Sequence, residues 1–204
     1  MTQTVRVPLT GNILYVSGTV NGVETVWTQE EDGWWSTTAQ RSTDGVYEVV
    51  LSIIYGSGQT VTDSVTLYYG LTLITDRTQS DVTNGKDKGF YNSSDLNRVG
   101  AAMAYLRDKF NDNGYDVSIQ PKTDWREIDV PTDSSMTLYL QCLGTLRGVL
   151  TVPDGTPETP ATMEGLTYIT ANNIEKILEA VDLVLNRSIT FLYYSGDIYS
   201  GEVV

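Results

Sequence analysis

The stretch Gly70-Leu71-Thr72-Leu73-Ile74 separates two halves of the sequence that have different patterns. Residues 1–72 are rich in Thr and Val, contain no lysine, and alternate between apolar and polar positions. Residues 92–186 hold three stretches in which apolar residues recur every three or four positions. Alternation with a period of two predicts strands, and spacings of three and four predict helices. We therefore expect an α+β chain of two domains, a β-domain over residues 1–72 and a small helical domain over residues 73–188.

Short strands bounded by turn residues fill the first domain. We expect strands over residues 12–20, 23–28, 34–40, 46–53 and 60–69. Asn21-Gly22 is a strong hairpin signal between the first two, because both residues tolerate a positive φ. Several short strands with regularly spaced turns are typical of an antiparallel sandwich.

The segment Asp44-Gly45-Val46-Tyr47-Glu48-Val49 resembles the D-x-G-x-Y-x-C corner of immunoglobulin-like domains, with Val49 where the cysteine would stand. In that corner a tyrosine hydroxyl bonds to an upstream backbone group, a role that would fall to Tyr47. We therefore expect the first domain to be an immunoglobulin-like β-sandwich rather than a barrel.

Three amphipathic helices are expected in the second domain, where they can close a small bundle. The first starts at Ser93 or Ser94 and ends at Asn113-Gly114. The second starts near Pro131-Thr132-Asp133, and the third is capped by Thr170. Their apolar stripes are Leu96, Val99, Met103, Leu106 and Phe110, then Met136, Leu140, Leu143, Leu146 and Leu150, then Ile174, Ile177, Leu178, Val181 and Leu185.

Residues 189–204 are expected to form an extended, strand-like C-terminal arm. The pattern Tyr-Ser-Gly-acid-apolar occurs at residues 194–198 and again at 199–203, which suggests an arm or hairpin. A terminal segment with this much apolar surface needs cover from a partner. We therefore expect it to pair with another subunit or to fold back on the sandwich edge, with candidate assembly residues Tyr193, Tyr194, Ile198 and Tyr199.

The net charge of −13 bears on the kind of partner. Seven acidic and two basic residues give −5 over residues 1–72, and residues 73–204 carry the other −8. Such a surface repels phosphate backbones and anionic lipids, so we expect neither nucleic-acid nor membrane binding. No run of 18 apolar residues is present, which predicts no membrane span. The first residues also lack the pattern of a secretory signal, so we expect the protein to be kept in the cytoplasm or to leave it without the general secretion route.

The residue types needed for common catalytic and metal sites are missing. The sequence has no histidine, which excludes Ser-His-Asp and Cys-His catalysis and Cys/His zinc sites. Cys142 is the only cysteine, and its position in an apolar stripe predicts a buried structural thiol. Glu30, Glu31 and Asp32 fit a solvated turn better than a calcium site. We therefore expect that the protein is not an enzyme and that it binds no cofactor and no metal. A carboxylate-based glycan hydrolase stays an alternative to this expectation.

Trp34 and Trp35 are the best ligand-binding candidates. Adjacent residues on a strand face opposite ways, so one indole is expected in the core and the other on the surface. An exposed tryptophan could stack on a sugar or anchor a protein contact. The alternative is that both rings only pack within the domain.

Two blocks of the second half resemble a segment of structural, often tail-associated, proteins of tailed bacteriophages and prophages of Gram-positive gut bacteria. The blocks are Leu73-Ile74-Thr75-Asp76-Arg77-Thr78-Gln79-Ser80-Asp81-Val82 and Tyr91-Asn92-Ser93-Ser94-Asp95-Leu96-Asn97-Arg98-Val99. Leu106, Asn113-Gly114-Tyr115 and Lys122-Thr123-Asp124-Trp125 follow them. The related proteins carry a longer helical insertion where this chain has only Thr83 to Phe90, so no role of that insertion is carried over.

The resemblance implies a non-enzymatic virion structural protein, assembled in the host cytoplasm with other virion proteins and as a homo-oligomer. It would display its immunoglobulin-like domain and assemble through the helical part and the arm. The alternative is a carbohydrate- or host-surface-binding module of a phage adsorption apparatus. Its ligand would then be a glycan of the host surface. Within the two blocks, we interpret Asp76, Arg77, Asp95 and Arg98 as an ion-pair and capping set that joins the domains.

Overall fold

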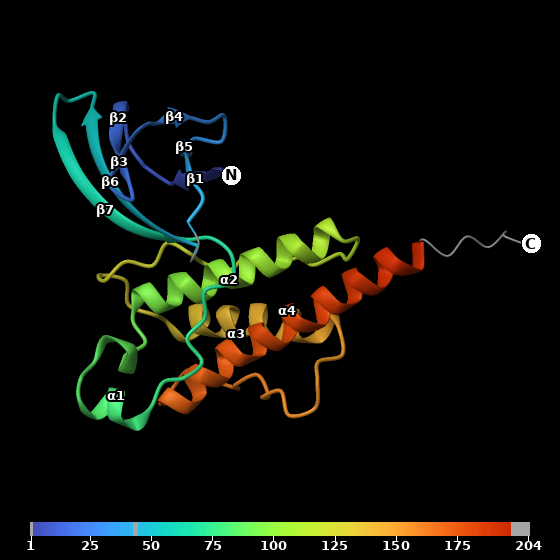
Figure 1. Cartoon of the computed structure of the whole chain (residues 1–204). Helices are drawn as coiled ribbons and strands as arrows, with labels where there is room; N and C mark the ends of the chain where they lie inside the picture. Colours follow the sequence, from blue (N-terminus) through green and yellow to red (C-terminus); the bar gives the residue numbers. More distant parts are fainter. Residues whose placement is uncertain (1, 43–44, 197–204) are drawn as a thin grey trace, which may run out of the picture. The chain divides into compact units, whose positions relative to one another are not determined.

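The computed structural model describes residues 2–42 and 45–196, and for residues 190–196 it describes the backbone alone. The chain divides into two compact units, Met1–Tyr69 and Gly70–Val204 (Figure 1). The first contains antiparallel sheets and the second contains helices, so the predicted α+β class is confirmed.

Seven strands form two antiparallel sheets in the first unit. They are β1 (Thr2–Val7), β2 (Ile13–Val20), β3 (Val23–Val26), β4 (Thr28–Gln29), β5 (Trp35–Gln40), β6 (Val46–Tyr55) and β7 (Thr60–Tyr68). One sheet has the order β1-β5-β4 and the other has the order β3-β2-β6-β7. Side chains of both sheets belong to one buried cluster, which includes Val5, Val16, Trp35, Tyr47 and Leu51.

The hairpin between β2 and β3 confirms the prediction from Asn21-Gly22. Both turn residues have positive φ, 50° and 77°, and Val20 pairs with Val23. One further glycine is required by close packing rather than by a turn. A Cβ on Gly18 would lie 2.1 Å from the carbonyl oxygen of Val50 on the neighbouring strand.

Two features of the sheets differ from the sequence prediction. β1 was not predicted, although Val5 and Val7 alternate with polar residues and are buried. The expected strand over residues 23–28 is in fact two strands, because β3 and β4 belong to different sheets. Trp27 lies between them and is 4 % exposed, so burial of its indole coincides with the crossing from one sheet to the other.

The second unit contains α1 (Gln79–Thr83), a 3₁₀ turn η1 (Asp87–Gly89), α2 (Ser93–Asp112), α3 (Asp133–Val149) and α4 (Tyr168–Gly196). The three long helices were predicted, whereas α1 and η1 were not. Residues 115–120 belong to no helix or strand.

The helix starts correct two capping predictions. Asn92, rather than Ser93 or Ser94, caps α2 and forms a capping box with Asp95. The hydroxyl oxygen of Thr167 accepts from the backbone of Thr170, so α4 begins before the predicted Thr170 cap. Thr132 caps α3 as expected. Serine and threonine are suitable N-cap residues at the predicted positions. When several such residues are adjacent, hydrogen-bond geometry and not residue type decides which one caps the helix.

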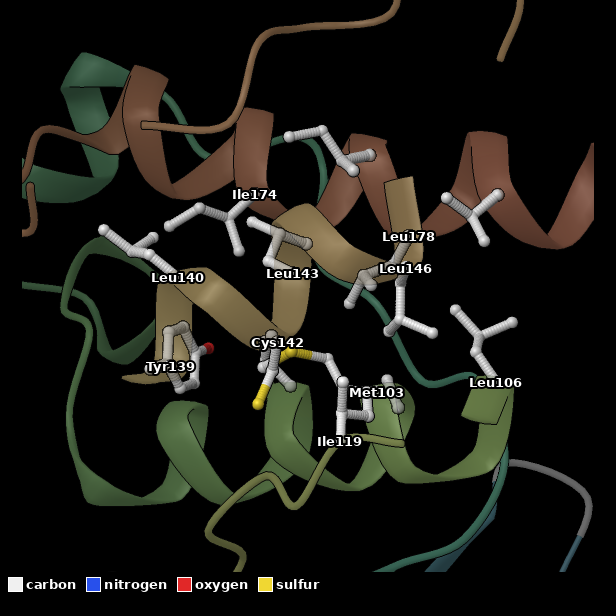
Figure 2. Close-up of a cluster of buried hydrophobic side chains, with 14 of the residues drawn as sticks. Met103, Leu106, Ile119, Tyr139, Leu140, Cys142, Leu143, Leu146, Ile174 and Leu178 are labelled. Atoms are coloured by element: carbon white, nitrogen blue, oxygen red, sulfur yellow. The ribbon is translucent and has the colours of Figure 1, made fainter. Parts of the chain in front are cut away.

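The core of the second unit lies between α2, α3 and α4. Figure 2 shows Met103 and Leu106 from α2 facing Leu143 and Leu146 from α3, with Leu178 from α4 beside them. These side chains are fully buried. Segment 115–125 also contributes, through Val117, Ile119 and Trp125. The apolar stripes predicted for the three helices therefore form one core.

The predicted strand-like arm is wrong for residues 189–196, which continue α4 as a helix to Gly196. Ile189 extends the spacing of the buried Val181 and Leu185 and packs partly against the core. Residues 197–204, with the candidates Ile198 and Tyr199, lie outside the described residues.

A capping box at α1 gives the second unit a pH-dependent element. The Asp81 carboxylate accepts from the hydroxyl and the backbone N–H of Thr78 and pairs with Lys86. These contacts lower the pKa of Asp81 from 3.8 to about 2, with the Thr78 hydroxyl as the largest cause.

We expect this carboxylate to add stability that is fully present above its ordinary pKa of 3.8 and is lost as the pH falls toward 2. The Asp81→Asn variant should therefore lose less melting temperature than wild type between about pH 5 and pH 2. Asp116→Asn, at an exposed position of the same unit, is the control and should keep the wild-type slope. Parallel curves for wild type and Asp81→Asn would remove this role from Asp81.

Candidate functional site

The two candidate indoles of the first unit differ in burial, as expected; Trp35 begins β5 and Trp34 precedes it. Trp35 is 6 % exposed and belongs to the core, whereas Trp34 is partly exposed. The guanidinium of Arg6 lies over the Trp34 ring, 5.1 Å from its centroid. One face of Trp34 is therefore taken by a side chain of the same unit, which reduces the ring area available to a sugar.

The acidic turn beside Trp34 holds that arginine in place. Arg6 pairs with Glu30 and, at 2.5 Å, with Asp32. The hydrogen bond from Arg6 lowers the pKa of the Asp32 carboxyl below its usual value. Asp32 also accepts from the Trp34 backbone N–H. The carboxylates of this turn that pair with Arg6 therefore hold its guanidinium over the Trp34 ring. They are already bound to a cation of the same chain.

The most tightly organised polar group of the chain is in the second unit. We call Arg77, Asp95, Arg98 and Glu175 the ionic cluster; each is buried, with Glu175 fully inaccessible. Arg77 pairs with Asp95 at 2.9 Å and with Glu175 at 2.8 Å. Arg98 pairs with the same two carboxylates, at 2.7 Å to Asp95. Two cations thus face two carboxylates, and the formal charge of the cluster is zero.

The ionic cluster fixes the extended segment that precedes α1. Glu175 accepts from the backbone N–H of Ile74, and Arg98 donates to the carbonyl of Thr72. The side chain of Asn172 donates to the carbonyl of Arg77 and accepts from its N–H. These bonds satisfy backbone groups that no helix or sheet serves, which is a structural role for buried charge.

The structure corrects the interpretation of the four charged residues in the two blocks. Arg77, Asp95 and Arg98 do come together, but Asp76 is exposed and pairs with Lys88 instead. Every partner of the ionic cluster named above lies in the Gly70–Val204 unit, so these contacts hold that unit together.

Sequence reasoning missed Glu175, which supplies half of the acidic charge. It stands next to Ile174 in the apolar stripe of α4, and 77 residues separate it from Arg98. No sign of a missing carboxylate was present in the sequence, because Asp76 and Asp95 already balanced the two arginines there.

Hydrogen bonds of an uncharged side chain join α2 to the segment that follows it. Asn97 of α2 accepts from the backbone N–H of Trp125 and donates to its carbonyl, at 2.7 and 2.9 Å. A Cβ on Gly100 would lie 2.4 Å from the carbonyl oxygen of Lys122, so α2 and this segment touch closely. Tyr91 and Tyr139 share a hydrogen bond of 2.7 Å, and burial raises the pKa of both hydroxyls well above the ordinary range. The second block is therefore in direct contact both with the segment around Trp125 and with α3.

The remaining candidates give no reactive centre in the part of the chain that the structure describes. Cys142 is a buried thiol, and burial raises its pKa, which disfavours the thiolate. No group of three His, Cys, Asp or Glu side chains suited to a metal occurs among residues 2–42 and 45–189. Of the assembly candidates, Tyr193 and Tyr194 lie on the last turns of α4, where the backbone is described.

In the described residues, no helix combines the length and the apolar character needed to cross a membrane. A scan against protein-family models and searches of curated proteins and of solved structures found no match.

Proposed function

We propose that this chain is a non-enzymatic structural protein of a tailed-bacteriophage virion, which displays an immunoglobulin-like module and is held in the particle by its helical unit. Its partners would be other virion proteins and further copies of itself. The proposal rests on the block resemblance and on one structural observation, the strand order of the first unit.

That strand order supports an immunoglobulin-like sandwich. The sheets β1-β5-β4 and β3-β2-β6-β7 match the orders B-E-D and C′-C-F-G of immunoglobulin-like domains, without strand A. Tyr47 lies at the start of β6, the equivalent of strand F. Its hydroxyl accepts from the backbone N–H of Ser42 at 2.8 Å, which is the bond of a tyrosine corner.

Tyr47→Phe is expected to lower the free energy of unfolding of the first unit by about 1–3 kcal/mol, because the Ser42 N–H loses its acceptor in a part-buried site. Urea unfolding followed by tryptophan fluorescence measures the change. Tyr55→Phe, on a half-buried tyrosine near the end of the same strand, is the matched control and should change it by less than about 0.5 kcal/mol. An unchanged midpoint for Tyr47→Phe would argue against the corner.

The structural role is supported by how the charged side chains are used. In the helical unit, the four buried charges pair with one another and bond to backbone groups of the same chain. In the first unit, the clustered carboxylates of the turn hold Arg6. Such use of charge builds a rigid scaffold rather than a site that changes protonation during a reaction.

Host-surface or carbohydrate binding remains the alternative and takes second place, because Arg6 covers one face of Trp34 and Trp35 is buried. A glycan array would detect it. Binding that is lost in Trp34→Ala but kept in Glu31→Ala would favour this alternative over a purely structural role.

A deletion experiment tests the proposal itself. Deleting the coding sequence from the phage or prophage genome should yield particles that lack a component or fail to complete assembly, as seen by electron microscopy. Expression of the chain in trans should restore them. Normal, infectious particles without the chain would contradict the proposal.

A further inference from the structure

Three asparagines of this chain are each followed by glycine, at Asn21-Gly22, Asn84-Gly85 and Asn113-Gly114. In such a pair the backbone nitrogen of the glycine can attack the side-chain carbonyl carbon of the asparagine, because glycine has no side chain that hinders the approach. The attack closes a succinimide ring and expels the side-chain nitrogen as ammonia. Water then opens the ring to aspartate or isoaspartate. The fold sets the relative rates of the three pairs, because it fixes the hydrogen bonds of the reacting groups.

The attacking nitrogen is free of hydrogen bonds at one of these pairs. In the part of the chain that the structure describes, the backbone N–H of Gly22 has no hydrogen-bond partner. The N–H of Gly85, by contrast, donates to the carbonyl of Val82 at 3.2 Å. The N–H of Gly114 donates to the carbonyl of Asn111 at 3.1 Å. Both of these nitrogens must give up a hydrogen bond before they can attack, and Gly22 need not.

The side-chain amide of Asn21 is polarised by a hydrogen bond to its oxygen. Its Oδ1 accepts from the backbone N–H of Glu48 at 2.8 Å. Negative charge develops on this oxygen when the nitrogen attacks, and a fixed N–H donor at this distance stabilises such charge. The side-chain amides of Asn84 and Asn113 are held by their nitrogen instead, which donates to a neighbouring oxygen in each case. Asn21 is thus held by the atom that must carry charge, and the other two by the atom that must leave.

Ring closure also requires a backbone rotation at Asn21, and the fold permits it. The bond between Cα and the carbonyl carbon must turn, so that the Gly22 nitrogen approaches the side chain. The backbone N–H and the Oδ1 of Asn21 are both bound to Glu48, and this rotation moves neither. It moves Gly22, which is exposed and where an added Cβ would meet no atom within 4 Å beyond its chain neighbours. Asn113-Gly114 has less freedom, because the next residue, Tyr115, packs against the core.

We infer that Asn21 is a site of spontaneous modification, at which the folded chain converts asparagine to aspartate and isoaspartate faster than at Asn84 or Asn113. The bond that forms joins the Gly22 nitrogen to Cγ of Asn21, and the bond that breaks releases ammonia. Water is the co-reactant that opens the ring, and no oxidant or reductant takes part. Each event adds one negative charge. The inference does not depend on the proposed virion role, because it concerns the chemistry of the folded chain alone.

The modification has a structural consequence for the strand that follows the turn. Isoaspartate adds one carbon atom to the backbone of a two-residue turn, so Val20 and Val23 no longer meet as its closing pair. β3 has only four residues, lies at the edge of its sheet and pairs there with β2 alone. Aspartate keeps the turn, because Asp-Gly favours the same turn type as Asn-Gly. Isoaspartate, and not aspartate, should therefore release β3 from β2.

Peptide mapping by tandem mass spectrometry tests the site. The folded full chain and the chain unfolded in guanidinium are incubated side by side at mildly alkaline pH, and the gain of one dalton is followed at each asparagine over days. In the folded chain, Asn21 should react at least about fivefold faster than Asn84 and Asn113, relative to the rates in the unfolded chain. Relative rates that are the same in both states, or an Asn21 that stays unmodified in the folded chain, would overturn the inference.

Asn21→Asp separates the effect of the added charge from that of the longer backbone. This variant carries the charge of the product without the extra carbon atom, and it should unfold in urea at the wild-type midpoint, followed by tryptophan fluorescence. The isoaspartate fraction of aged wild-type protein, isolated by chromatography, should unfold at a lower urea concentration. An isoaspartate fraction that keeps the wild-type midpoint would contradict the release of β3. A variant as unstable as that fraction would assign the loss to charge instead and contradict it as well.

Discussion

Glu175→Ala is expected to lower the free energy of unfolding of the helical unit by about 3–5 kcal/mol. The alanine leaves Arg77 and Arg98 buried with Asp95 as their one remaining carboxylate in the ionic cluster. It also removes the acceptor of the Ile74 backbone N–H. An uncompensated buried cation costs far more than the loss of an exposed ion pair.

Urea unfolding followed by circular dichroism at 222 nm measures this effect, because the helices dominate the signal. Glu179→Ala, one turn later on an exposed position of α4, is the matched control and should change stability by less than about 0.5 kcal/mol. If both variants unfold at the wild-type midpoint, the ionic cluster does not stabilise the unit.

Phe110→Ala is expected to cost about 3–5 kcal/mol in the same unit. The Phe110 side chain is fully buried among α2, α3 and α4 and makes an edge-to-face contact with Tyr115, with ring centroids 5.3 Å apart. Truncation removes that contact and leaves a cavity that the rigid helices close only in part.

The control for this variant is Phe90→Ala, which truncates a phenylalanine that is 53 % exposed and should have little effect. Tryptophan fluorescence adds a second readout, since three of the four tryptophans lie in the first unit. We expect the fluorescence transition of that unit to stay in place while the circular dichroism transition moves. A loss of stability in both signals would mean that the two units unfold as one.

The helices could be predicted because their stabilisation is local in sequence. Apolar residues at spacings of three and four fix α2, α3 and the bundled part of α4, and Asn113-Gly114 marks the end of α2. The β2–β3 hairpin was equally predictable from Asn21-Gly22. By contrast, β1 pairs with β5 across 28 to 38 residues of sequence, from Val7 with Trp35 to Thr2 with Gln40, and its six residues carry no turn signal of their own.

The ionic cluster could be predicted only in part, for the same reason. Arg77, Asp95 and Arg98 lie close in sequence and in charged blocks, whereas Glu175 arrives from a helix far along the chain. The end of α4 was mispredicted because strand-forming residue types were weighed without the long helix that precedes them. Where tertiary contacts decide, sequence pattern alone names the residues but not their partners.

The proposed virion role is tested most directly by quantitative mass spectrometry of gradient-purified phage particles from a strain that encodes this chain. We expect that peptides of both units co-purify with the particles at a fixed ratio to the major capsid protein, and that this ratio survives washing in high salt. Peptides found in the host lysate but absent from the washed particles would contradict it.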